Sequence, residues 1–144
     1  MRFPRSLAGW TIAVFGFLAF ALGVLGLVSP DSLLVILGFE TVPTGERAPG
    51  DYTLVYMAAS SMAAVNMGAY YMLASAVEFR PFYVWTVPFR LVTFTVFTIL
   101  VVIGNAPDRF LGVAIWEGVG AVVTGAALWW ESRRARATSV TSST

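Results

Sequence analysis

Four long apolar stretches constrain this chain more than any other feature of its sequence. Each is close to the roughly 20 residues that an α-helix needs to cross the hydrocarbon core of a bilayer. The stretches run over residues 7–28, 52–77, 82–104 and 110–130. Helices satisfy their own backbone polar groups, which lipid cannot do. The sequence therefore predicts an all-α, polytopic membrane protein, with a bundle of four transmembrane helices as a single domain over residues 1–130.

The composition agrees with this class and removes many kinds of chemistry. Of the 144 residues, 58% are apolar and 12% are charged, against about 45–50% and 25% in soluble domains. The chain has no Cys, His or Lys, so the usual ligands of transition metals, the thiolate nucleophile and the Ser-His-Asp triad are missing. Nine arginines against eight acidic residues give no basic field for nucleic acid. We expect the lipid bilayer as partner, and no cofactor, metal site or nucleic acid.

The connection between the first two stretches contains a shorter predicted helix. Ser29 can cap it, Pro30 suits its first position, and Gly38 can end it. The apolar segment between them is too short to span a bilayer. We therefore predict an interfacial helix here, with a re-entrant segment as the alternative. At the other end of the chain, residues 131–144 are polar and predict a disordered cytoplasmic tail.

Arginine positions predict the orientation, because cytoplasmic loops carry an excess of Lys and Arg. With both termini in the cytoplasm, the inner segments hold Arg2, Arg5, Arg80, Arg133, Arg134 and Arg136, and the outer loops hold only Arg47 and Arg109. We therefore predict a multi-pass protein of the inner or plasma membrane. A cleaved signal peptide is the alternative for the first stretch, which is longer than the 7–15 apolar residues of such signals. Glu78 and Arg80 read as ordinary loop charges.

Small residues recur along three of the four stretches, where they allow backbones to approach in lipid. They are Gly9, Gly16 and Gly23 in the first, Ser60, Ala64 and Gly68 in the second, and Ala114, Gly118, Ala121 and Gly125 in the fourth. Ala59 and Ala63 give the second stretch another small-residue face, so we expect it to be the central helix. Such stripes indicate packing within the chain, and a homo-oligomer is the alternative.

Three polar residues fall at similar depth within the stretches. Arg90 lies near 15 Å, Asn66 near 18 Å and Glu117 near 21 Å from the cytoplasmic ends, at about 1.5 Å per residue. A charge facing lipid at the bilayer centre costs about 3 kcal/mol or more. We therefore expect Arg90 and Glu117 to face inward and to pair, or to face a wet cavity.

Two interpretations of this polar layer have about equal support from the sequence. In the first, Arg90, Glu117 and Asn66 form a structural clasp that orders the helices. In the second, they form a pocket for an anionic or polar-headed small molecule, with Glu117 as counter-charge or proton site. A third arrangement has Arg90 reaching the inner interface while Glu117 stays protonated.

Several segments resemble the BphX-like family of small bacterial four-helix membrane proteins. The similarity lies in residues 66–71, 80–90 and 116–117. The segment from Pro30 to Gly38 is also similar to an element after the first span in other uncharacterised four-helix bacterial families. The resemblance implies a four-helix membrane fold with no assigned enzyme activity. Some members of the family are encoded in gene clusters for aromatic catabolism.

Three functions are compatible with these observations. The sequence favours a non-enzymatic accessory or small-molecule-binding membrane protein, with a small lipophilic compound as ligand and no catalytic residues. A proton-coupled transporter that resembles the small multidrug resistance class is the first alternative, although that class carries its glutamate in the first helix. An intramembrane enzyme that uses Glu117 as acid and base is the second.

Overall fold

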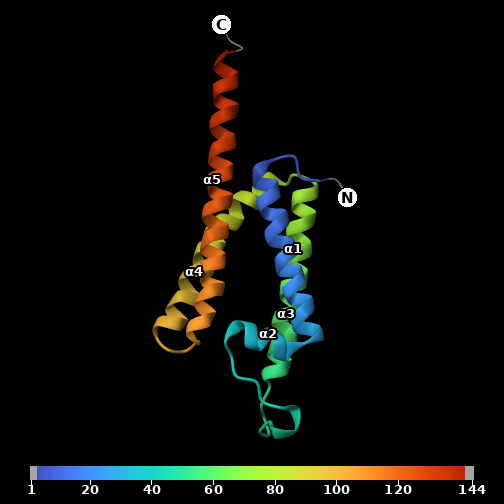
Figure 1. Cartoon of the computed structure of the whole chain (residues 1–144). Helices are drawn as coiled ribbons and strands as arrows, with labels where there is room; N and C mark the ends of the chain where they lie inside the picture. The colour runs from blue at the N-terminus through green and yellow to red at the C-terminus, as the bar shows by residue number, and fades with distance from the viewer. Residues whose placement is uncertain (1–2, 142–144) are drawn as a thin grey trace.

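The structure, a computed structural model, describes residues 3–141, and these residues form helices and loops without a strand (Figure 1). The all-α prediction is confirmed. The helices are α1 (Leu7–Val28), α2 (Pro30–Leu37), α3 (Thr53–Ala76), α4 (Arg80–Val102) and α5 (Leu111–Thr141). Two short 3-10 turns complete the chain, η1 (Thr44–Glu46) and η2 (Asp108–Phe110). The helices α1, α3 and α4 coincide with the first three apolar stretches of the sequence, and α5 covers the fourth and continues beyond it.

Three segments of the described chain are long and apolar enough to cross a membrane. They are Leu7–Val28, Arg80–Val102 and Asp108–Ala137. The fourth long helix, α3, has 24 residues and therefore sufficient length. It contains serines, an asparagine and tyrosines, and it is not among the segments apolar enough to span a membrane by composition. The membrane class thus rests on three helices, and the position of α3 needs a separate argument.

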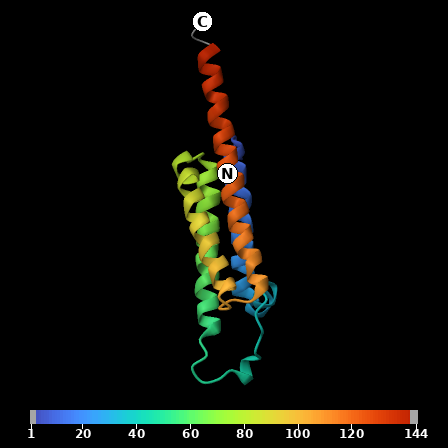
Figure 2. The same cartoon turned by 90° about the vertical axis from the view of Figure 1, so that its left-hand side faces the viewer.

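The long helices form two antiparallel hairpins, one of α1 with α3 and one of α4 with α5 (Figures 1 and 2). Contacts within each hairpin are extensive, whereas contacts between the hairpins are fewer and run mainly from α1 to α5. We expected the second long helix to be central. In the structure α1 has that place, because it contacts α2, α3, α4 and α5, while α3 packs mainly on α1.

Glycines explain why α1 and α3 lie so close together. A Cβ added to Gly68 would lie 2.5 Å from the carbonyl oxygen of Gly16, and one added to Gly23 would lie 2.7 Å from the carbonyl oxygen of Ser61. These distances leave no room for a side chain, so the backbones themselves are in contact. The predicted packing role of the glycine stripe in the first helix is confirmed at Gly16 and Gly23. In lipid, such close contact is a main source of helix association.

One end of the molecule is held together by two carboxylates, which we call the N-terminal clasp. Glu78 accepts hydrogen bonds from the Arg5 backbone nitrogen and from both the backbone nitrogen and the hydroxyl of Ser6, at 2.9 and 2.6 Å for Ser6. Glu131 of α5 accepts from the Ala8 backbone nitrogen at 3.0 Å and pairs with Arg80 at 2.9 Å. Both carboxylates thus lie at the positive N-terminus of α1. The reading of Glu78 and Arg80 as ordinary loop charges was wrong.

The hairpins also meet at the opposite end, where α2 packs on α1 and α3 of the first hairpin. The helix α2 begins at Pro30 and ends at Gly38, whose φ of 87° suits glycine, as the sequence predicts. Ser29 is the N-cap residue, but its hydroxyl contacts the Ser32 hydroxyl and makes no cap hydrogen bond. After α2, the ring of Phe39 lies 5.8 Å from that of Phe110. This aromatic contact joins the first hairpin to the second.

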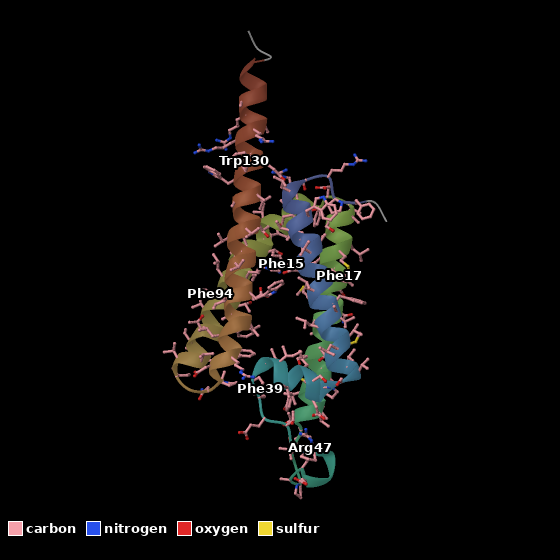
Figure 3. The ribbon with its side chains drawn as sticks, viewed as in Figure 1. Phe15, Phe17, Phe39, Arg47, Phe94 and Trp130 are labelled. Carbon is pink, nitrogen blue, oxygen red and sulfur yellow. The ribbon has the colours of Figure 1, made fainter. Side chains whose placement is uncertain are left out.

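Arg47 orders the long connection that follows α2. Its guanidinium lies 2.9 Å from the Asp51 carboxylate and 3.8 Å from the Asp31 carboxylate (Figure 3). Hydrogen bonds from Thr53 hold the pKa of Asp51 below its ordinary value. The start of α2 and the start of α3 are therefore linked through one side chain.

The last helix extends well beyond the bundle (Figure 1). We expected a disordered tail from residue 131, but the structure continues α5 to Thr141. The Arg133 and Arg134 guanidinium carbons lie 4.1 and 5.0 Å from the ring centres of Trp129 and Trp130, one helical turn earlier. These cation–π contacts at i, i+4 spacing stabilise the extension. Residues 1–2, with Arg2, and residues 142–144 lie outside the described part.

Candidate functional site

Arg90 sits where all four long helices come together. The helix α4 is exposed over most of its surface, and its buried residues Tyr83, Thr86 and Arg90 form one stripe at helical spacing. This stripe brings the arginine between the two hairpins. Only 4% of Arg90 is exposed. A charged residue almost never reaches such burial unless partners surround it.

The partners of the Arg90 guanidinium come from three other helices. Its central carbon lies 4.1 Å from the ring centre of Phe15 on α1 and 5.3 Å from that of Tyr71 on α3. Phe15 points from α1 toward the second hairpin (Figure 3). From α5, Gly120 provides the space, since an added Cβ would lie 1.8 Å from the Arg90 Nη1. Cation–π contacts of a desolvated arginine contribute up to about 2 kcal/mol each.

Glu117 is the acidic partner of Arg90. Its Oε2 lies 3.6 Å from the Arg90 Nε, within ion-pair distance and beyond hydrogen-bond distance. The Glu117 side chain is 22% exposed, whereas that of Arg90 is 5% exposed. The structure thus brings together the two charges that the sequence singles out. The buried position of Arg90 differs from the alternative arrangement, in which the Arg90 side chain extends to the inner membrane interface.

The arginine keeps unused hydrogen-bond donors. Both its Nε and its Nη1 are buried and have no hydrogen-bond acceptor among the described residues. A buried donor without an acceptor costs about 1–3 kcal/mol, and more when it is charged. The Arg90–Glu117 pair is therefore an incompletely satisfied polar centre, and the unused donors of Arg90 are chemically suited to a negatively charged or oxygen-bearing group.

Asn66 does not join this centre. It is exposed on α3 and is absent from the contacts of both Arg90 and Glu117. Its neighbour Gly68 faces α1, and two residues correspond to about 200° around a helix. The depth of Asn66 fits the expected polar layer, but its direction does not. The layer therefore consists of Arg90 and Glu117.

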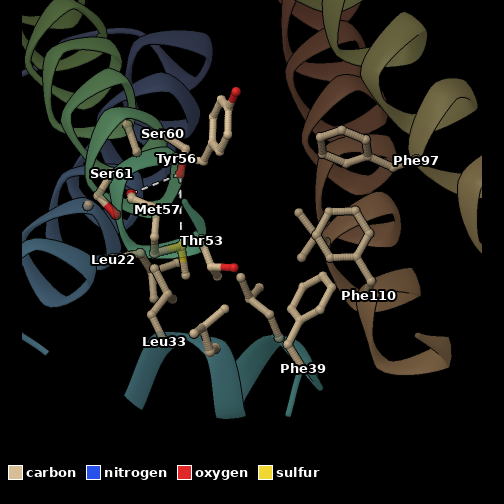
Figure 4. Close-up of a pocket in the computed structure, with 15 residues that line it drawn as sticks. Leu22, Leu33, Phe39, Thr53, Tyr56, Met57, Ser60, Ser61, Phe97 and Phe110 are labelled. Atoms are coloured by element: carbon tan, nitrogen blue, oxygen red, sulfur yellow. Dashed lines mark hydrogen bonds between the residues drawn. The ribbon is translucent and has the colours of Figure 1, made fainter. Parts of the chain in front are cut away.

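A large apolar cleft opens between the hairpins on the side of α2 (Figure 4). Its volume is about 890 Å³, at the upper end of small-molecule sites. One wall contains Leu22, Met57 and Ser60, and the other contains Phe97 and Phe110. Leu33, Leu34, Leu37 and Phe39 form its floor. Several lining side chains are exposed, such as Tyr56 at 74% and Leu22 at 44%, so the cleft is open at the molecular surface.

The cleft and the charged pair follow each other along α5. Val113 lines the cleft, Glu117 is one turn further on, and Gly120 lies against Arg90. At about 1.5 Å per residue, the seven residues from Val113 to Gly120 cover roughly 10 Å. Along α5, Glu117 therefore lies between a residue that lines the cleft and the glycine that contacts Arg90.

Sequence reasoning did not find the cleft, because it arises from how the hairpins diverge. The lining residues are scattered over five helices and the loops beside them. The aromatic residues Phe39, Phe97 and Phe110 gave no signal in the sequence, because they share no helix face and meet only in the fold. Within residues 3–141, Asp and Glu side chains nowhere gather in a group of three that could hold a metal ion.

Comparisons with protein-family models, curated proteins and solved structures find no match to this chain. The similarity to the BphX-like family consequently stays a prediction.

Proposed function

We propose that this chain is a four-span, non-enzymatic protein of the inner or plasma membrane that binds a small lipophilic molecule in the cleft between its hairpins. The observation that carries the proposal is the cleft itself. It offers about 890 Å³ of apolar space that opens to the side of the molecule, where a membrane protein meets lipid.

The argument for α3 as the fourth span comes from its contact with α1. Ala74 packs with Ala8 and Ile12 near the start of α1, and Ser61 lies against Gly26 near its end. The two helices are therefore side by side over nearly their whole length. If α1 crosses the bilayer, α3 has the same depth range. The small and polar residues of α3 are then in part covered by α1, which accounts for its lower apolarity.

The arrangement of arginines supports cytoplasmic termini. Arg5, Arg80 and the arginines of the α5 extension lie at the end that holds the N-terminal clasp, and Arg47 and Arg109 lie at the α2 end (Figures 1 and 3). This asymmetry follows the positive-inside rule. A reporter enzyme fused after Thr144 should be active in the cytoplasm. Activity of a periplasmic reporter at that position would reverse the orientation.

The binding proposal can be tested with a neutral lipophilic probe. Purified full-length protein in nanodiscs of zwitterionic lipid should bind radiolabelled dodecanol at a saturable site. Ser60 is exposed and lines the cleft, so Ser60→Phe should fill the cleft and weaken binding about tenfold or more. Ala59→Phe is the matched control, because Ala59 is exposed on the same helix and does not line the cleft.

Two results would contradict the proposal. One is the absence of saturable binding by the wild-type protein. The other is equal loss of binding in the Ser60 and Ala59 variants, which would indicate a general disturbance of α3 or binding outside the cleft.

The transport and enzyme hypotheses have their own outcomes. Proton-coupled flux of a bound compound in proteoliposomes that Glu117→Gln abolishes would replace simple binding by transport. Chemical turnover of a lipophilic compound by the purified protein, lost in the same variant, would establish an enzyme.

A further inference from the structure

The polar centre above the cleft has the features of a headgroup site. Arg90 carries two buried donors without acceptors, the Nε and the Nη1. Its guanidinium is already fixed in place by Phe15 and by the space at Gly120. A preorganised arginine with free donors is suited to a carboxylate or another oxyanion, which accepts hydrogen bonds in its planar geometry.

The ion pair between Glu117 and Arg90 is weak. The 3.6 Å separation from the Arg90 Nε leaves an ion pair without a hydrogen bond. The greater exposure of the glutamate places it on the accessible side of the pair. A carboxylate that reaches the Arg90 donors at hydrogen-bond distance can therefore take the position that Glu117 now holds.

The dimensions of the cleft suit an extended apolar chain. Along α3 the lining runs from Thr53 to Ala64, which is about 16 Å of helix. The walls are aliphatic and aromatic, and the few polar groups are hydroxyls such as those of Ser60 and Tyr56. The lining contains no charged side chain, so the cleft itself selects only for an apolar chain. Any charge complement for a headgroup has to lie outside the lining, where Arg90 packs against Gly120 of α5.

We infer that the ligand is a single-chain anionic amphiphile whose chain lies in the cleft and whose carboxylate, or equivalent oxyanion, binds Arg90 in place of Glu117. This assignment rests on the proposed binding function and specifies its ligand class. The apolar chain of the ligand fits the cleft, and its charged head distinguishes it from other lipophilic molecules. Glu117 acts as an internal competitor for the arginine.

Two probes with the same chain test the inference. Dodecanoate, at an alkaline pH that keeps its carboxylate ionised, and dodecanol are compared by equilibrium binding to the protein in zwitterionic nanodiscs. The wild-type protein should prefer dodecanoate by about tenfold, the effect of one charge-assisted hydrogen bond. Glu117→Gln should increase that preference by removing the competitor, while dodecanol binding stays unchanged.

The double variant Arg90→Gln/Glu117→Gln removes the guanidinium that would bind the ligand's carboxylate. It also removes the Glu117 carboxylate, so that no unpaired charge stays buried. It should bind dodecanol as the wild type does and should lose the preference for dodecanoate. Circular dichroism and the unfolding midpoint establish that it is folded. If it cannot be isolated in a folded state, the response of Glu117→Gln alone decides.

The outcomes separate the inference from the proposed function. Binding of both probes with equal affinity in the wild type and in Glu117→Gln overturns the headgroup site and leaves the cleft function intact. A preference for dodecanoate that persists in the folded double variant also overturns the assignment to Arg90. Binding of neither probe overturns the cleft function together with the inference.

Discussion

Replacing Gly68 by alanine tests whether backbone contact holds the first hairpin together. An alanine Cβ at this position would lie 2.5 Å from the Gly16 carbonyl oxygen and 2.5 Å from the Phe20 nitrogen. Ordinary contact begins at about 3.4 Å, so α1 and α3 must separate locally by about 0.9 Å (3.4 minus 2.5). Both obstructing atoms are backbone and cannot rotate away. We therefore expect the upper part of the usual overpacking range, about 2–3 kcal/mol.

The intrinsic helix preference of alanine acts in the opposite direction and is worth about 1 kcal/mol. The net loss for Gly68→Ala is then about 1–2 kcal/mol. Gly112→Ala is the matched control, because Gly112 lies in α5 and an added Cβ there meets nothing within 4 Å. That variant should be neutral or up to about 1 kcal/mol more stable.

The measurement is unfolding in mixed micelles by titration with dodecyl sulfate, followed by circular dichroism and tryptophan fluorescence. The two variants should differ by about 1–3 kcal/mol, with Gly68→Ala less stable than the wild type. If Gly68→Ala and Gly112→Ala shift the midpoint equally, close backbone contact does not hold α1 to α3. Separate analysis of the purified monomer excludes an effect on self-association.

Two further changes probe the polar contacts. Burial raises the pKa of Glu78, but the hydrogen bonds from Ser6 and Arg5 outweigh it and bring the pKa below its ordinary 4.5. The stability that Glu78 adds is therefore present above pH 4.5 and is lost as the pH falls through the lowered pKa. Glu78→Gln should cost about 1–2 kcal/mol at neutral pH and flatten the acid limb of stability against pH; an unchanged acid limb would contradict the clasp. Thr124→Val breaks the 3.0 Å hydrogen bond between the Thr124 and Thr11 hydroxyls and should cost about 0.6 kcal/mol of stability in the same unfolding assay. The control is Thr95→Val, which should be nearly neutral because the Thr95 hydroxyl donates to a carbonyl of its own helix. Equal effects of the two changes would refute an interhelical role for Thr124.

Local features of the sequence predicted local structure well. The long helices follow from runs of apolar residues, and the bounds of α2 follow from Pro30 and Gly38, because these residues restrict the backbone directly. The similar height of Arg90 and Glu117 along their helices also followed, since it depends only on counting residues from the helix ends. This is why Arg90 and Glu117 were correctly brought together on neighbouring helices.

Which helices and side chains contact one another could not be predicted in the same way. Glycine stripes mark faces that admit a neighbour, but they do not say which helix will fill each face, so the central place of α1 was missed. Asn66 was assigned by depth alone, and its rotation about the axis of α3 depends on which face α1 covers. Glu78 caps a helix that begins about 70 residues earlier in the chain, and nothing in its local sequence indicates that return.

The sideways opening of the cleft changes what affinity means for this molecule. If the protein lies in a bilayer as proposed, lipid chains enter the cleft when no ligand is bound, so every binding event is then an exchange of one apolar chain for another. Both chains are apolar, so the free energies of moving one into the cleft and the other into the lipid largely cancel, as they do for helices that associate in lipid. Selectivity must then come from the head of the molecule, and occupancy depends on the mole fraction of ligand in the membrane instead of its concentration in water.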